Sequence, residues 1–407
     1  MKVLNHTISD RNLFQKQLLI YFRDAKNVVF LNSNDSEKTN LLAISNSNFV
    51  SSEMNQFGFI SYDYKNKIED LYSDHYDGIA FPEKHFFTPQ ILFEIGESNV
   101  EISFESDFEE KNANQLISEI ESISVDFKES KKIKILPRIT KEEYLTTIID
   151  LKKHIKLGNI YEVNFCQEYY SEQVEIDPID IYIKLNKKSP TPFSCFVKFE
   201  DKYLMSASPE RYIQKSGNKI LSQPIKGTAK RGENPEEDEL IKKELFNDPK
   251  ERSENVMIVD LVRNDLSRIA KKDSIVVDEL CGIYTFPQVH QMISTVSGEV
   301  KKEVDFETIL KATFPMGSMT GAPKLRAMKL IEKYEKTKRG LYSGTVGYIN
   351  EKGDFDFSVV IRSIAYNSKN NYLSFMVGGA ITNQSDPEKE YEECLLKAKA
   401  MLEVLSD

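Results

Sequence analysis

The 407-residue chain contains no tryptophan, only four cysteines and no long apolar run. The cysteines stand far apart and form no C-x-x-C pair, so neither a disulfide scaffold nor a thiolate metal site is expected. No segment approaches the ~18 consecutive apolar residues of a membrane span, and the first residues lack the apolar core of a signal peptide. These absences predict a cytoplasmic protein with reduced thiols.

The chain also lacks an excess of positive charge, since 64 Asp and Glu outnumber 54 Lys and Arg and the formal net charge is −10. This balance argues against a nucleic-acid groove and against an anionic membrane surface. An anionic substrate would therefore need positive charge supplied locally, by a metal ion or by a few Lys and Arg side chains. The length and the 40% content of hydrophobic residues permit two or three domains, or one unusually large one.

A polar and charged stretch over residues 105–137 is the expected boundary between two parts of the chain, and a solvated helix and loop are the alternative. We expect residues 1–125 to form an N-terminal segment of mixed strands and short helices, in which we identify no catalytic constellation. The second part, 138–405, contains all the candidate functional motifs. Its helices are expected at four places: 140–157, 249–266, from an N-cap at Thr320 to about 336, and from Asp386-Pro387 to about 405.

Between the last two helices, residues 343–350, 354–366 and 372–382 have the pattern of a three-stranded antiparallel meander. Arg362 would then lie inside the middle strand, where a solvated charge is not normally central. This placement makes Arg362 a candidate binding residue.

Lys226 lies between Pro224-Ile225 and Gly227-Thr228. Proline restricts the approaching backbone, and glycine allows close approach of a ligand or of another strand. Such a rigid loop would suit a nucleophilic or anion-binding amine. On these five residues alone, a β-turn with a surface lysine is the alternative.

Two helices beginning with Asp-Pro each carry two glutamates three residues apart, Glu251 with Glu254 and Glu390 with Glu393. Residues at this spacing share a helix face, so the two helices could bring four carboxylates together. Hard oxygen ligands with room for water suit Mg²⁺. The alternatives are chance pairs in a highly charged chain and an ordinary ion pair between Glu393 and Lys397.

Taken together, the chain resembles the chorismate-utilising enzymes, and the resemblance covers about residues 160–400. The motifs that carry it are Gly158-Asn-Ile-Tyr-Glu-Val-Asn164, Ser208-Pro-Glu210, Pro224-Ile-Lys-Gly-Thr228, Glu254 through Asp265, Gly317-Ser-Met-Thr-Gly-Ala-Pro-Lys324, Tyr342 through Gly347, Ile361-Arg362, Gly378-Gly379 and Glu390 through Lys397. The resemblance implies an α/β (α+β) fold, a large two-layer antiparallel β-sandwich flanked by helices, to which both parts of the chain contribute.

The resemblance also implies a site. Glu254 and Glu393 would ligate Mg²⁺ directly, while Glu251 and Glu390 would hold metal-bound waters. Tyr342 and Arg362 would hold the enolpyruvyl carboxylate of chorismate, and His290 matches the active-site histidine of the family. The remaining positions assigned to the substrate pocket are Gly227, Thr228, Ser318, Gly378, Gly379, Lys397 and Asn164.

The branch that the chain resembles most is the large component of the aminodeoxychorismate synthases, because anthranilate-forming relatives carry alanine at the position of Lys226. Isochorismate-forming relatives carry a water-activating lysine at the position of Glu162. In the implied reaction Lys226 adds to the chorismate ring while Glu210, as general acid, protonates the departing 4-hydroxyl. Ammonia then enters at C4. A free lysine has a pKa of about 10.4, so we expect burial, Mg²⁺ and Arg362 to lower it. A purely electrostatic role for Lys226 is the alternative.

The sequence contains no Gly-x-Cys-x-Gly-x-Gln glutaminase elbow. We therefore expect ammonia to come from a separate glutamine amidotransferase subunit, and a separate lyase to act on the product. Two rival functions are the large component of an anthranilate synthase and a non-catalytic chorismate-binding subunit.

Overall fold

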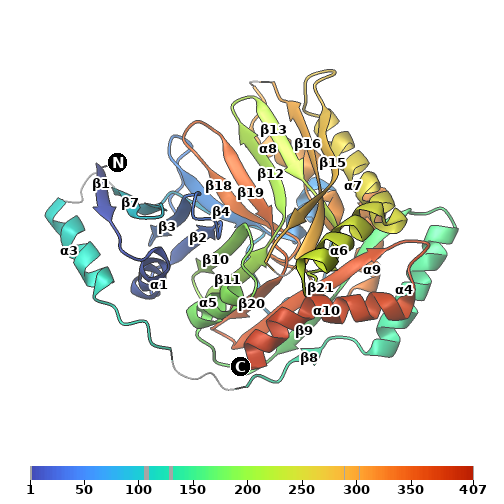
Figure 1. Cartoon of the computed structure of the whole chain (residues 1–407), viewed down its shortest axis with the longest axis horizontal. Helices are drawn as coiled ribbons and strands as arrows, with labels where there is room; N and C mark the ends of the chain where they lie inside the picture. The colour runs from blue at the N-terminus through green and yellow to red at the C-terminus, as the bar shows by residue number, and fades with distance from the viewer. Residues whose placement is uncertain (1, 105–109, 128–131, 288, 302, 407) are drawn as a thin grey trace.

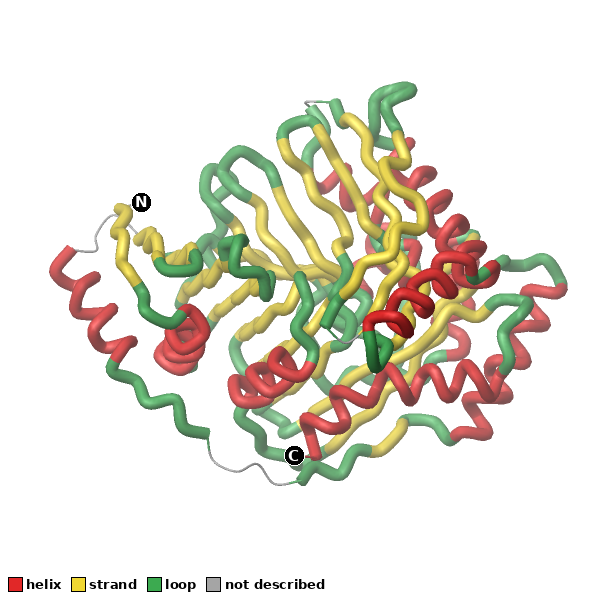
Figure 2. The backbone as a smooth tube through the Cα atoms, viewed as in Figure 1, coloured by secondary structure: helices red, strands yellow, loops and turns green. Residues whose placement is uncertain are grey.

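The computed structural model describes residues 2–104, 110–127, 132–287, 289–301 and 303–406, and two large antiparallel sheets form its framework (Figures 1 and 2). One apolar cluster joins the two layers: Val29 and Val197 of the first sheet pack with Phe57, Phe59 and Val346 of the second. This arrangement confirms the expected two-layer sandwich.

Among the described residues the first sheet has twelve strands and the second has nine. In spatial order the first contains β1 Lys2–Thr7, β7 Asn99–Phe104, β6 Ile91–Ile95, β3 Asn40–Ser45, β2 Asn27–Asn32, β10 Phe193–Phe199, β11 Lys202–Ser208, β20 Ser363–Asn367, β21 Tyr372–Ile381, β9 Glu162–Ser171 and β17 Gly321–Ala322, with β8 Leu136–Pro137 beside β9. The second contains β14 Ile225–Lys230, β16 Val289–Glu299, β13 Lys219–Gln223, β12 Arg211–Ser216, β19 Phe355–Val359, β18 Thr345–Ile349, β4 Gln56–Ile60 and β5 Lys84–Phe87, with β15 Val276–Thr285 beside β16.

Helices cover the outer faces and one end of the sandwich (Figure 1). They are α1 Arg11–Tyr21, α2 Lys65–Ile68, α3 Glu110–Glu121, α4 Lys141–Lys156, α5 Pro178–Lys188, α6 Pro235–Asn247, α7 Pro249–Ser267, α8 Phe306–Thr313, α9 Lys324–Tyr334 and α10 Pro387–Ser406, with short 3₁₀ turns η1 Tyr62–Tyr64 and η2 Gly317–Met319. No helix in the described ranges is both long and apolar enough to cross a membrane.

Local signals explain three of the predicted helices. Thr140 and Glu143 form the capping box that begins α4, and Gly158 follows its end with a φ of 73°. The Asp248 carboxylate accepts the backbone N–H of Lys250 at the start of α7. Helix α10 begins, as expected, immediately after Asp386.

Two local predictions are wrong. Thr320 does not cap α9, which begins after Pro323; its hydroxyl donates to the backbone carbonyl of Met316 instead. The meander does not exist as one sheet, because β18 and β19 belong to the second sheet while β20 and β21 belong to the first. The chain crosses between the layers at 360–362, so Arg362 lies at this crossing and not inside a strand.

Strands from residues 1–125 lie within both layers, not beside them. In the first sheet β2 pairs with β10, and in the second β4 pairs with β18. Of the stretch predicted as a boundary, residues 105–109 and 128–131 lie outside the described residues. The two parts of the chain thus share one framework.

Candidate active site

Lys226 is buried on β14, with a side chain that is 10% exposed. Its Nζ donates to Oε1 of Glu162 at 2.8 Å, and Glu162, at the start of β9, is fully buried. Gly227 has a φ of 86°, and a Cβ there would lie 3.2 Å from Oε2 of Glu251. Ile225–Lys230 is therefore a strand whose Lys226 side chain points inward, and the alternative of a turn with a surface lysine is wrong.

The charge around Lys226 differs from the expected environment. Burial lowers the pKa of its amine, but the carboxylates of Glu162, Glu254 and Glu210 raise it by more, so the net pKa lies above the ordinary value. Carboxylates, not cations, surround the side chain. In this arrangement Lys226 is an ammonium ion paired with Glu162.

Glu210 follows β11 and is also buried. Its Oε1 accepts the hydroxyl of Ser318 at 2.7 Å. Burial raises the pKa of Glu210 to about 7, against the lowering effects of Ser318, Lys226 and Arg362. A carboxyl group with such a pKa is protonated in a substantial fraction of molecules at neutral pH, which suits a general acid.

Arg362 adopts a φ of 49°, which is costly for a residue other than glycine. Its backbone carbonyl accepts the N–H of Ala207 on β11, and this bond fixes the crossing between the layers. Within the described part of the chain its guanidinium has neither a hydrogen bond nor an ion pair. Burial lowers the pKa of Arg362, and the carboxylate of Glu210 partly offsets this effect. The side chain is thus a cation available to an anionic ligand.

The four glutamates of α7 and α10 lie in one region. Glu254 and Glu390 are buried, at 7% and 4% exposed, and Oε1 of Glu254 has no hydrogen-bond partner among the described residues. A Cβ at Gly379 would lie 3.3 Å from Oε2 of Glu390, so the absence of a side chain there leaves space beside that carboxylate. The two helices are near enough for one lysine, Lys250, to lie within 4 Å of both Glu254 and Glu390, and the role of the four glutamates as a metal site stays a prediction.

Lys250, which the sequence did not single out, lies between the two helices. Its Nζ is 3.6 Å from Oε1 of Glu390 and 3.9 Å from Oε1 of Glu254. Partial burial lowers the pKa of Lys250, while all four glutamates raise it by more. The lysine is a built-in counter-ion for the carboxylates.

The donor set fits a hard divalent cation such as Mg²⁺, because it consists of carboxylates and includes a buried, unpartnered oxygen. No three Asp, Glu, His or Cys side chains in the described ranges converge as closely as one ion would require. Burial raises the pKa of Glu254 to about 7, against the lowering effects of Lys226 and Lys250. A proton and the Lys250 ammonium thus neutralise charge that a metal would otherwise neutralise.

Several predicted residues have other contacts. Glu393 is half exposed and forms an ion pair with Lys397 at 2.8 Å, which is the alternative that the sequence left open. Lys397 also donates to the carbonyl of Gly378 at 2.9 Å. The amide of Asn164 donates to the carbonyl of Ser318 at 3.1 Å, which ties β9 to the η2 turn.

Two further predicted residues are not joined to the cluster by any hydrogen bond in the described structure. Both ring nitrogens of His290 have partners elsewhere, Thr285 at 3.0 Å and Asp238 at 2.8 Å. Thr228 is exposed on β14. A direct role for either residue stays a prediction.

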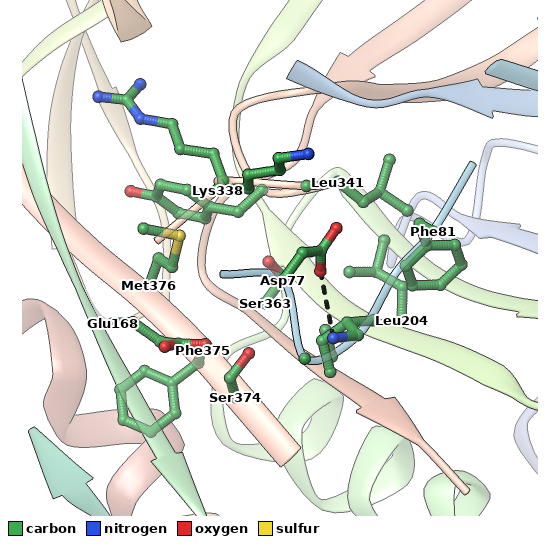
Figure 3. A pocket seen from close by; sticks show the side chains of 16 residues that line it. Asp77, Phe81, Glu168, Leu204, Lys338, Leu341, Ser363, Ser374, Phe375 and Met376 are labelled. Atoms are coloured by element: carbon green, nitrogen blue, oxygen red, sulfur yellow. Dashed lines mark hydrogen bonds between the residues drawn. The ribbon is translucent and has the colours of Figure 1, made fainter. Parts of the chain in front are cut away.

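A cavity of about 30 Å³ is lined by residues of β9, β11, β20 and β21 in the first sheet and by the segments 77–81 and 338–342 (Figure 3). Glu168, Ser363, Ser374 and Lys338 are among its lining residues, and Figure 3 shows their side chains around the hollow. This volume holds one or two waters, not a chorismate molecule. Of the predicted site residues, Tyr342 alone lines it, so the cavity is separate from the carboxylate cluster.

The sequence did not predict the contact between Glu162 and Lys226 or the position of Lys250. The position of Lys250 had a local signal, because Lys250 stands four residues before Glu254 in the same helix. The contact between Glu162 and Lys226 had no local signal, because β9 and β14 belong to different sheets.

Comparisons with known proteins identify the family of the chain. The family model described as "chorismate binding enzyme" matches residues 7–403. The chain is 37% identical over 333 residues to the chloroplastic aminodeoxychorismate synthase of Arabidopsis thaliana, covering 78% of this chain and 36% of that protein. It is 32% identical over 360 residues to aminodeoxychorismate synthase component 1 of Bacillus subtilis (strain 168), covering 86% and 76%.

Anthranilate-forming proteins are similar as well. Anthranilate synthase component 1 of Aquifex aeolicus (strain VF5) is 37% identical over 266 residues, covering 65% of this chain and 53% of that protein. The crystal structure of anthranilate synthase component I from Streptococcus pneumoniae TIGR4 superposes with a TM-score of 0.77 at 24% identity, covering 99% and 92%. The chain thus spans about a third of the Arabidopsis relative and about half of the Aquifex relative.

Proposed function

The chain belongs to the chorismate-binding enzymes, and from this membership we propose that it aminates chorismate at C4 as the large component of an aminodeoxychorismate synthase. The observation that carries the proposal is the buried Lys226, which hydrogen bonds with Glu162 and is influenced electrostatically by Glu210. Relatives named aminodeoxychorismate synthase support it.

In the proposed reaction Arg362 and Tyr342 bind the enolpyruvyl carboxylate, since the guanidinium of Arg362 has planar bidentate donors and no competing partner. Glu210 donates its proton to the departing 4-hydroxyl, and the Lys226 amine adds to the ring. Ammonia then attacks C4 and the lysine leaves. The new ammonium group returns a proton to Glu210, so the net change is chorismate plus ammonia to 4-amino-4-deoxychorismate plus water.

Glu254 and Glu393 would hold Mg²⁺ directly, and Glu251 and Glu390 would hold its waters. The bound ion would supply positive charge for the ring carboxylate of chorismate. We further propose that ammonia comes from a separate glutamine amidotransferase subunit, and that the protein acts in the cytoplasm.

The test is a product assay with chorismate, Mg²⁺ and ammonium. We expect p-aminobenzoate only after addition of an aminodeoxychorismate lyase. Fluorescent anthranilate without added lyase would favour the rival function, anthranilate synthase component 1, which the similarity to the Aquifex enzyme keeps in view. Chorismate binding without turnover at saturating ammonium would favour a non-catalytic subunit.

A further inference from the structure

Glu162 has no assigned part in the chemistry proposed above, yet it makes the closest polar contact of Lys226. The carboxylate is 0% exposed, and its Oε1 accepts the Lys226 ammonium at 2.8 Å. Its Oε2 is buried without a hydrogen-bond partner in the described ranges. A buried carboxylate oxygen without a hydrogen-bond donor destabilises the fold unless a bound ligand donates a hydrogen bond to it.

Lys226 must lose a proton before it can attack, because an ammonium ion has no free electron pair. The carboxylates that act on it are Glu162 from β9, Glu251 and Glu254 from α7, Glu393 from α10 and Glu210 after β11. Within the described structure, Glu162 is the one that hydrogen bonds with the amine. Glu210 is held by Ser318 and is assigned to the leaving hydroxyl.

We propose that Glu162 is the proton acceptor of Lys226 and that its free oxygen receives the incoming ammonia. This inference rests on the proposed amination. A proton passes from the Lys226 ammonium to Oε1 of Glu162, and the freed electron pair forms the bond to the ring as the 4-hydroxyl leaves with the proton of Glu210. When ammonia displaces the lysine, Glu162 returns the proton to the departing amine.

The transfer suits a buried pair, because burial disfavours the charged form of both partners and a lysine–carboxylic acid pair is neutral. Oε2 offers an acceptor to an N–H of ammonia, a donor with no other assigned partner. Glutamine at this position would keep one acceptor oxygen but could not take a proton.

The test compares the wild type, Glu162→Gln and Glu162→Asp in the full chain with chorismate, Mg²⁺ and ammonium. We expect Glu162→Gln to lower kcat about 10²-fold or more at pH 7, to raise KM for ammonium and to leave chorismate binding within about threefold of wild type. Its pH–rate profile should gain a new limb that rises with pH, because Lys226 must then lose its proton to solvent. Glu162→Asp should restore part of the rate.

Glu168→Gln is a matched control, since Glu168 is a buried, ion-paired carboxylate on the same strand that contacts Arg138. It reports the general effect of removing such a charge, and its pH–rate profile should keep the wild-type shape. An active wild type with an unchanged Glu162→Gln profile and rate would overturn this inference alone. A wild type that forms no aminated product would overturn the proposed function as well. If Glu162→Gln does not fold, an Asp variant without partial activity or with an unaltered ammonium KM would overturn the inference.

Discussion

Replacing Lys250 by methionine should tighten Mg²⁺ binding while destabilising the metal-free protein. The ammonium lies 3.6 Å from Glu390 and 3.9 Å from Glu254, between the helices that carry the glutamate pairs. A divalent cation held by these carboxylates must displace the lysine or be repelled by it. Methionine keeps much of the side-chain volume and removes the charge.

The magnitude follows from the two ion pairs. At these separations each pair contributes about 1 kcal/mol in a water-like dielectric, the appropriate choice because Lys250 is 37% exposed and screened by solvent. We therefore expect Lys250→Met to bind Mg²⁺ about tenfold more tightly, which corresponds to ~1.4 kcal/mol. For a chain of this length a loss of the same size lowers Tm in EDTA by about 1.5–2 °C.

Isothermal titration calorimetry with Mg²⁺ measures the affinity, and thermal unfolding in EDTA and in excess Mg²⁺ measures the linkage. The gain in Tm on adding Mg²⁺ should be larger in the variant than in the wild type. Lys242→Met is the matched control, because Lys242 pairs with Glu239 on the surface of α6. Its replacement should change neither the free energy of Mg²⁺ binding nor that of unfolding by more than ~1 kcal/mol. An unchanged or weaker Mg²⁺ affinity in Lys250→Met would refute the competition between lysine and metal.

Four further predictions concern the carboxylates and the lysine of the site. Lys226→Ala should slow amination about 10³-fold or more and release some anthranilate, and unchanged kinetics would exclude a covalent role. Glu254→Gln should weaken Mg²⁺ binding about 10- to 100-fold. Because the pKa of Glu254 is raised to about 7, wild-type Mg²⁺ affinity should rise with pH up to about 7 and then level off, which calorimetry at several pH values checks. Because Glu210 donates a proton and has a pKa of about 7, amination should fall as pH rises above 7, and a rate that is flat to pH 9 would count against it as the acid.

The parts of the site that were predicted depend on local signals. The Asp-Pro pair marks where each helix begins, because capping depends on residues within one turn. It therefore fixes how far along the helix Glu254 and Glu390 lie. The inward orientation of Lys226 was expected from the family resemblance, because its flanking proline and glycine alone left a surface turn open. Sequence patterns of this range are sufficient to place single elements.

The parts that were missed depend on distant segments. Residues 354–366 have one continuous strand pattern, and nothing local indicates that the chain changes sheets before Arg362. The carboxylates around Lys226 come from β9, α7, α10 and the residues after β11, so its raised pKa had no signal in the sequence. Lys250 interacts with Glu390 across a separation of 140 positions, which only the folded chain brings together.

Both sheets combine strands from residues 1–125 with strands from the rest of the chain, which has a consequence for producing the two parts as separate fragments. A break near residue 125 would leave β10 without β2 and β18 without β4, so each piece would present unpaired backbone along a sheet. The two fragments, when produced separately, should therefore aggregate and be poorly soluble. When they are produced together, we expect them to reassemble through these strand pairs. An insertion intended to tether a partner belongs on an outer turn, not near residue 125.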